Sequence, residues 1–231
     1  MSEEPLRLGI AAEGISDYHI LLAAAKSMAG GKPIVATLLQ PEESDAFTGG
    51  GDAGPLGGGW KGVGKWCFQA ARRGGGKLSG GLLDLFDVLI LHLDADVAAE
   101  EPAEGSPFVG LPCEQPCPPA VDTTDALRAV MLRWTGESAI PARVVLCTPS
   151  KSMDAWVMEA FFPDDREMNR LGKECHGGPA SRLAQQPKRA RFSKSGYRGK
   201  AAEFEKRWTK VTNALDEARR YETEFVAALR S

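Results

Sequence analysis

Short runs of apolar residues recur along the first two thirds of the chain. Between them lie segments in which apolar residues are spaced by three and four positions. Runs of mostly apolar residues predict four buried strands, at residues 6–12, 32–39, 87–93 and 143–147. Apolar residues spaced by three and four predict helices at residues 17–28, 60–71, 122–134 and 153–161. Apolar strands that alternate with helices are typical of a parallel sheet covered on both faces. The pattern predicts a three-layer α/β/α fold over residues 1–162.

The remaining residues, 163–231, follow a different pattern. Residues 164–199 are polar and basic, with weak periodicity, whereas residues 201–229 read as one long amphipathic helix. Its apolar stripe consists of Phe204, Trp208, Val211, Leu215, Ala218, Phe225 and Leu229. Glu222 interrupts this stripe. We expect a C-terminal helical extension that packs on the core, although a helix that docks on a partner would have the same pattern.

The overall composition excludes few classes of function. The formal net charge is −3, so overall charge gives no sign of nucleic-acid binding. No apolar run is long enough to span a bilayer, and the first residues do not resemble a signal peptide, so we expect a cytoplasmic protein without a membrane partner. The chain has five cysteines, an odd number that predicts reduced thiols. A zinc site at Cys113, Cys117, Cys175 and His176 is the alternative, with loose ligand spacing.

Carboxylates stand where two predicted strands end. Glu13 and Asp17 follow the first strand, and Asp94 and Asp96 follow the third. The carboxyl ends of parallel strands share one edge of a sheet, and sites form there where the strand order reverses. Grouped carboxylates repel one another unless a cation or a proton intervenes, and carboxylate oxygens suit Mg²⁺. We therefore expect a site for Mg²⁺ or Mn²⁺ at this edge.

These two motifs resemble those of a known family. Glu13-Gly14-Ile15-Ser16-Asp17 and Asp94-Ala95-Asp96 are similar to the acidic motifs of the Toprim domain, which occurs in topoisomerases, bacterial primases, recombination mediators and the overcoming-lysogenization-defect nucleases. The first motif is most like that of the last group and of small Toprim-like phage-defence proteins. Some of these proteins carry a motif similar to residues 151–156, with glutamate where this chain has Asp154. The resemblance covers residues 6–162 and implies a Toprim-like, Rossmann-like sheet.

The resemblance also implies an activity and its residues. Glu13 would be a catalytic acid or base as well as a metal ligand, and Lys151 and Ser152 would act at the rim of the site, Lys151 on phosphate charge. The implied metal ligands are Glu13, Asp17, Asp94, Asp96 and Asp154. The implied function is a Mg²⁺-dependent nuclease of DNA or RNA, in a phage-defence or mobile-element system. The alternative is a non-catalytic Toprim module that binds nucleic acid or a partner protein, such as a separate ATPase subunit.

Simpler interpretations exist for the same residues. Asp17 and Asp154 could be first-turn acids that complement a helix dipole. Asp94 and Asp96 could be acids at the entrance of a loop. His92, inside a strand and without a matching partner in the sequence, is more typical of a core residue than of a ligand.

A basic run precedes the last predicted helix. It consists of Lys188, Arg189, Arg191, Lys194, Arg198 and Lys200, with Phe192 and Tyr197 between them. Basic residues interleaved with aromatic rings suit nucleic acid, because cations neutralise phosphates and rings stack on bases. The alternative is a solvated connection between two parts of the fold.

Overall fold

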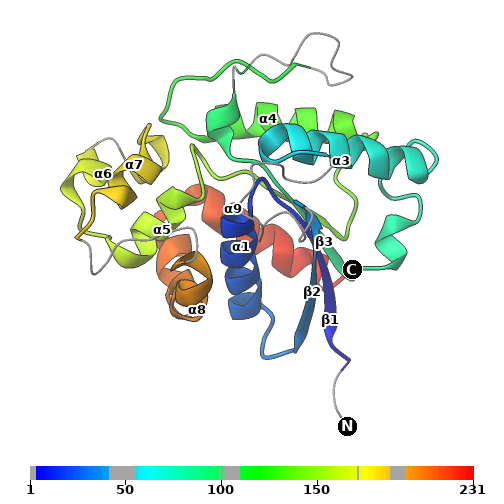
Figure 1. Ribbon diagram of the computed structural model, residues 1–231, viewed down its shortest axis with the longest axis horizontal. Helices are drawn as coiled ribbons and strands as arrows, with labels where there is room; N and C mark the ends of the chain where they lie inside the picture. The colour runs from blue at the N-terminus through cyan, green and yellow to red at the C-terminus, as the bar shows by residue number, and fades with distance from the viewer. Residues whose placement is uncertain (1–3, 42–55, 99, 101–109, 171, 188–195) are drawn as a thin grey trace.

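A four-stranded parallel sheet forms the centre of the protein (Figure 1). The computed structural model describes residues 4–41, 56–98, 100, 110–170, 172–187 and 196–231. The strands are β1 (Leu6–Ala11), β2 (Ile34–Gln40), β3 (Val88–His92) and β4 (Val144–Cys147), in the order β2-β1-β3-β4. All four predicted strands are confirmed. Because β2 lies on one side of β1 and β3 on the other, the strand order reverses between β1 and β3.

Helices cover both faces of the sheet, so the predicted α/β/α fold is confirmed (Figure 1). One face carries α3 (Gly59–Arg73) and α4 (Val121–Thr135). The other carries α1 (Ile15–Met28), α5 (Asp154–Phe161), α8 (Gly196–Ala214) and α9 (Asp216–Ala228). Side chains of β3 alternate between the faces: Val88 and Ile90 pack with α1, whereas Leu89 and Leu91 pack with α3 and α4. This alternation follows from the two-residue period of a strand, and both sets are apolar because both faces are covered.

The C-terminal region contains two helices, so the prediction of one helix over residues 201–229 was wrong. The chain is extended at Leu215, with φ −122° and ψ 125°, and this residue separates α8 from α9. The Arg219 guanidinium donates hydrogen bonds to the Thr212 carbonyl at 3.1 Å and the Asn213 carbonyl at 3.2 Å. The Glu217 amide donates to Glu174 Oε1 at 2.7 Å. The side chains of Arg219 and Glu174 thus satisfy polar groups that the two helix ends expose.

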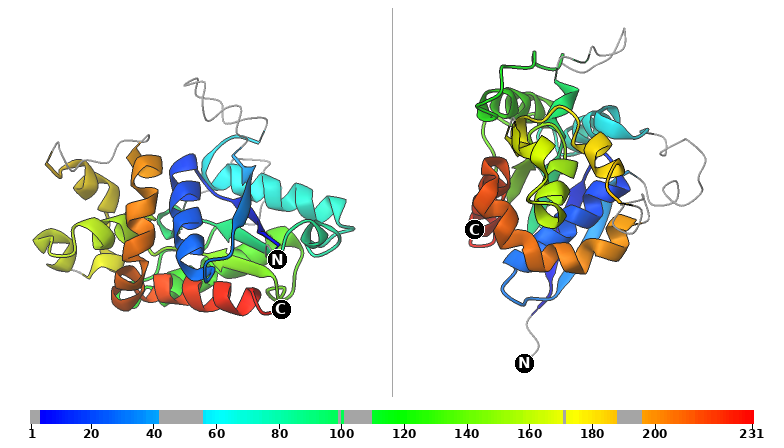
Figure 2. Two further views of the ribbon diagram at one scale, coloured as in Figure 1. Left: turned by 90° about the horizontal axis from the view of Figure 1, so that it is seen from below. Right: turned by 90° about the vertical axis from the view of Figure 1, so that its left-hand side faces the viewer.

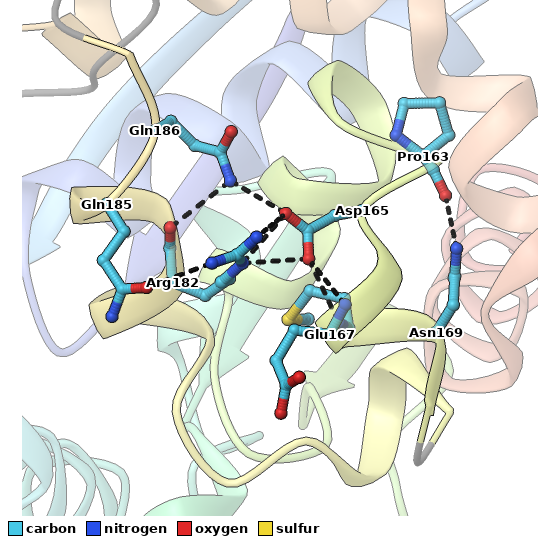
Figure 3. Close-up of polar contacts among 8 residues, drawn as sticks. Pro163, Asp165, Glu167, Asn169, Arg182, Gln185 and Gln186 are labelled. Carbon is cyan, nitrogen blue, oxygen red and sulfur yellow. Dashed lines mark hydrogen bonds and ion pairs between the residues drawn. The ribbon is translucent and has the colours of Figure 1, made fainter.

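Residues 164–187, predicted to have little regular structure, contain three short helical elements. These are α6 (Arg166–Arg170), η3 (Lys173–Cys175) and α7 (Pro179–Ala184). Asp165 holds α6 and α7 together (Figure 3). Its carboxylate accepts hydrogen bonds from the Glu167 and Met168 amides at 3.1 Å, from Arg182 Nε at 2.9 Å and from Gln186 Nε2 at 3.0 Å. The bond from Arg182 is the main reason that the pKa of Asp165 is lowered to about 2.

The cysteines do not all behave as predicted. Cys117 and Cys175 form a disulfide with a Cα–Cα distance of 5.4 Å, which joins the segment before α4 to η3. The expectation of reduced thiols was therefore wrong for this pair, and the zinc alternative loses two of its three thiols. Cys67 and Cys147 are buried thiols, and Cys113 is exposed. Within the described ranges, no helix has the length and apolar content needed to cross a membrane.

Candidate functional site

The first two acidic motifs meet at the carboxyl ends of β1 and β3. These strands pair in parallel, with Ala11 opposite Leu91, so the residues that follow them emerge side by side. The Asp94 amide donates a hydrogen bond of 2.8 Å to Glu13 Oε1, across 81 positions of sequence. Glu13 and Asp94 therefore lie together at the point where the strand order reverses.

The third motif, at residues 151–154, adjoins the same place. The Met153 amide donates to Asp94 Oδ1 at 2.8 Å, and the Asp96 amide donates to the Lys151 carbonyl at 2.9 Å. These bonds tie the segment after β3 to the segment after β4. Asp96 is exposed at the rim, whereas the Asp94 side chain retains only 17% of its accessible area.

Asp17 and Asp154 reach the site from the first turns of α1 and α5. Each is partly buried. The charge of Asp94 contributes to raising the pKa of Asp17, and the charge of Asp154 contributes to raising the pKa of Asp94. The Tyr197 hydroxyl donates to Asp154 Oδ1, so the start of α8 also contacts the cluster. Gly14 occupies the N-cap position of α1, and Ser16 lies within the first turn.

Burial and mutual repulsion make these five carboxylates hard to ionise. Burial is the main reason that the pKa values of Glu13 and Asp94 are raised well above normal, with added repulsion from Asp94 on Glu13 and from Asp96 on Asp94. Burial also raises the pKa of Asp17 from 3.8 to about 7, and raises those of Asp96 and Asp154. Ionised carboxylates in this cluster repel one another, and a bound cation would offset this repulsion.

The chemistry of the cluster fits a hard cation, although the present side-chain positions do not enclose one. In the described part of the chain, no group of three or more His, Cys, Asp or Glu side chains is arranged to hold a metal ion. The donors available are carboxylate oxygens, which Mg²⁺ and Mn²⁺ prefer. The buried hydroxyls of Thr148 and Ser152 have no hydrogen-bond partner among the described residues. Binding would require the carboxylates to turn toward a shared centre.

The two rim residues differ in their environment. Lys151 adopts a left-handed backbone conformation, with φ 63°, which is uncommon for a residue with a side chain. Its ammonium group forms an ion pair with Glu114, and its charge partly offsets the burial that raises the pKa of Asp96. Ser152 is buried beside this turn, with 7% of its area exposed.

The predicted basic residues are only partly visible. Lys188, Arg189, Arg191 and Lys194 lie outside the described residues. Lys200 forms an ion pair with Glu203 at 2.8 Å, and its ammonium lies 5.7 Å from the centre of the Phe161 ring. Arg198, near the start of α8, lines a groove against α1.

Two residues of the site were not assigned to it from the sequence. His92 is fully buried, and its Nε2 lies 3.1 Å from Asp94 Oδ1, so the imidazole helps to fix the carboxylate. The spacing of two along a strand, which puts both side chains on one side, was the signal for this contact. No sequence signal pairs Tyr197 with Asp154, because the contact joins α8 to α5.

Comparison with family models, curated proteins and solved structures found no match to this chain. The resemblance to the Toprim family therefore depends on the three motifs alone.

Proposed function

We propose that this protein is a Mg²⁺- or Mn²⁺-dependent nuclease that hydrolyses phosphodiester bonds in DNA or RNA, as the Toprim resemblance implies. One observation carries the proposal: Glu13 and Asp94, from motifs 81 positions apart, touch at the strand-order reversal, within a cluster of carboxylates with raised pKa values. A buried cluster of this kind has no stabilising value of its own, since each charge makes the next harder to form.

The carboxylates have separate roles in this proposal. Glu13, Asp94 and Asp96 would hold the cation, with Asp17 and Asp154 close enough to contribute to its charge balance. When bound, such a cation polarises a phosphoryl oxygen and lowers the pKa of coordinated water. Glu13 keeps its proton to a higher pH than an ordinary carboxyl group, because burial raises its pKa, and this favours a role in proton transfer.

Lys151 and His92 would support this chemistry. His92 holds Asp94 in place through its Nε2. Lys151 would exchange its exposed partner Glu114 for a phosphodiester oxygen of the substrate, which likewise carries negative charge and accepts a charge-assisted hydrogen bond. Ser152, with an unpartnered hydroxyl among the described residues, could donate a hydrogen bond to the same group.

Cleavage assays on labelled single- and double-stranded DNA and RNA test the proposal. We expect cleavage that needs Mg²⁺ or Mn²⁺ and stops with chelator. Asp94→Asn should abolish it, because the amide still accepts the Met153 hydrogen bond but supplies no charge. The matched control is Asp122→Asn, an exposed acid in the first turn of α4. Equal cleavage by wild type and Asp94→Asn would indicate a contaminating nuclease and contradict the proposal.

The second candidate is a non-catalytic module that binds nucleic acid or a partner such as an ATPase subunit. Two observations favour it: the described side chains do not enclose an ion as they stand, and Lys151 is already paired with Glu114. Nucleic-acid binding by the wild type without cleavage at any divalent concentration would support this candidate. A place in a phage-defence or mobile-element system stays a prediction from the resemblance.

A further inference from the structure

A groove runs along α1, and residues of α8 and of the edge strand β2 also line it. Its volume is about 700 Å³. Figure 2 shows α8, in orange, beside α1, in blue, with β2 on the other side of α1. The residues that matter here are Tyr18, His19 and Lys26 from α1, Thr37 from β2, and Arg198 and Ala201 from α8. One wall therefore comes from the C-terminal helical region and the other from the segment that carries the first acidic motif.

Several lining residues of the groove adjoin members of the carboxylate cluster in the sequence. Ile15 lies two positions after Glu13, and Tyr18 directly follows Asp17. On the opposite wall, Arg198 directly follows Tyr197, whose hydroxyl is bonded to Asp154. A chain lying in this groove would reach the carboxylates at its end.

The lining combines cations with aromatic rings. Lys26 and Arg198 have no ion-pair partner among the described residues, and Glu205 is the one acid among the described lining residues. The rings of Tyr18 and His19 lie 5.5 Å apart, tilted by 58°. Cations that track phosphates and rings that stack on bases are the two features by which proteins bind single strands.

We propose that this groove binds a single-stranded segment of nucleic acid and leads it to the carboxylate cluster, the second part resting on the proposed nuclease function. Lys26 and Arg198 contact successive phosphates, and an unstacked base lies against the rings of Tyr18 and His19. A duplex is excluded from this contact because its bases are already stacked on one another inside the helix. Thr37 and Ala201, which carry no charge, also line the groove.

Measuring oligonucleotide binding in the presence of chelator tests the groove separately, because no divalent cation is then available to the carboxylate cluster. The full chain is titrated against fluorescently labelled single-stranded DNA, single-stranded RNA and a duplex, from low to high salt. The test variant is Lys26→Gln with Arg198→Gln. The control variant, Lys65→Gln with Arg133→Gln, makes the same charge change at exposed positions of α3 and α4, on the opposite face of the sheet.

We expect the wild type to bind single strands more tightly than duplex. The groove variant should bind about tenfold or more weakly near 0.1 M salt and lose about 1.4 from the slope of log K against log salt, since each lost phosphate contact removes about 0.7. The control should change affinity less than about twofold. Equal weakening of both variants, unchanged binding by the groove variant, or preference for duplex would each overturn the proposal.

Failure of the proposed nuclease function has a different outcome. A protein that binds single strands through the groove, yet does not cleave them with any divalent cation, would retain the groove and lose the catalytic role. Cleavage by the wild type, together with unaltered binding by the groove variant, would support the nuclease function and contradict the role of the groove.

Discussion

Replacing Asp17 with asparagine should stabilise the protein in the absence of metal. The folded structure raises the pKa of this carboxyl group from 3.8 to about 7, chiefly because it is buried, with further repulsion from Asp94 and Asp154. Between these pH values the folded state binds a proton that the unfolded state has lost. Stability therefore falls as pH rises through this window, and the penalty is fully present above pH 7.

The size of the effect follows from the shift. About three pKa units correspond to about 4 kcal/mol, at roughly 1.4 kcal/mol per unit. Asp17 is only partly buried, so water screens part of this energy, and we expect about 1–3 kcal/mol. At pH 8, Asp17→Asn should unfold at a higher urea concentration than the wild type, whereas at pH 4 the two should be nearly equal.

Urea denaturation at pH 4, 6 and 8 with chelator, followed by tryptophan fluorescence, measures this difference. The control is Asp122→Asn in the first turn of α4, where loss of a favourable charge–dipole contact should cost about 0.3–1 kcal/mol. If Asp17 is only a helix-terminal acid, its asparagine variant should also be less stable at pH 8. That result would refute the argument that the carboxylates repel one another in the apo protein.

Three further predictions concern the fold. Asp165→Asn should cost about 1–2 kcal/mol near neutral pH, after allowance for solvent screening, since the lowered pKa of about 2 reflects chiefly the hydrogen bond from Arg182 to the ionised carboxylate. This contribution should disappear as pH falls from 3.8 toward 2. Gly62→Ala should cost about 1–3 kcal/mol, because its new carbon would lie 2.2 Å from the Gly57 carbonyl oxygen. Gly199→Ala should gain about 0.5–1 kcal/mol, because nothing lies within 4 Å and alanine favours helix.

Chemical denaturation measures all three changes. A pH-independent loss for Asp165→Asn would show that geometry, not charge, joins α6 to α7. Equal stability of Gly62→Ala and wild type would contradict the close packing of α3 against the turn that precedes it. A less stable Gly199→Ala variant would contradict the helical geometry of α8 at this position.

The sheet could be predicted because each strand carries its own signal. Parallel strands buried on both faces need continuous apolar residues, as in residues 88–91, and such runs do not depend on distant partners. The meeting of Glu13 and Asp94 followed from the same reasoning, since strand ends determine where the next residues emerge. His92 was assigned to the core because the sequence shows no matching partner for it, although its spacing of two from Asp94 was a signal for the contact that the structure shows.

The C-terminal region was harder to predict because its structure depends on tertiary contacts. The apolar stripe continues through Leu215, so the sequence pattern does not show the break between α8 and α9, where the bonds from Arg219 and to Glu174 form. Glu222, which interrupts the stripe, accepts a hydrogen bond of 3.0 Å from Trp208 Nε1. A polar residue in an apolar stripe can thus be required by a buried donor across a helix pair.

The central claim is that the carboxylate cluster at the ends of β1 and β3 binds a divalent cation. Calorimetric titration of the purified protein with Mn²⁺ at pH 7, in two buffers of different ionisation enthalpy, tests it most directly. We predict saturable binding with release of protons, because carboxyl groups with raised pKa values must ionise to coordinate metal. Asp94→Asn should abolish this binding, and Asp122→Asn should retain it. Absence of saturable binding, or binding that Asp94→Asn leaves unchanged, would contradict the account.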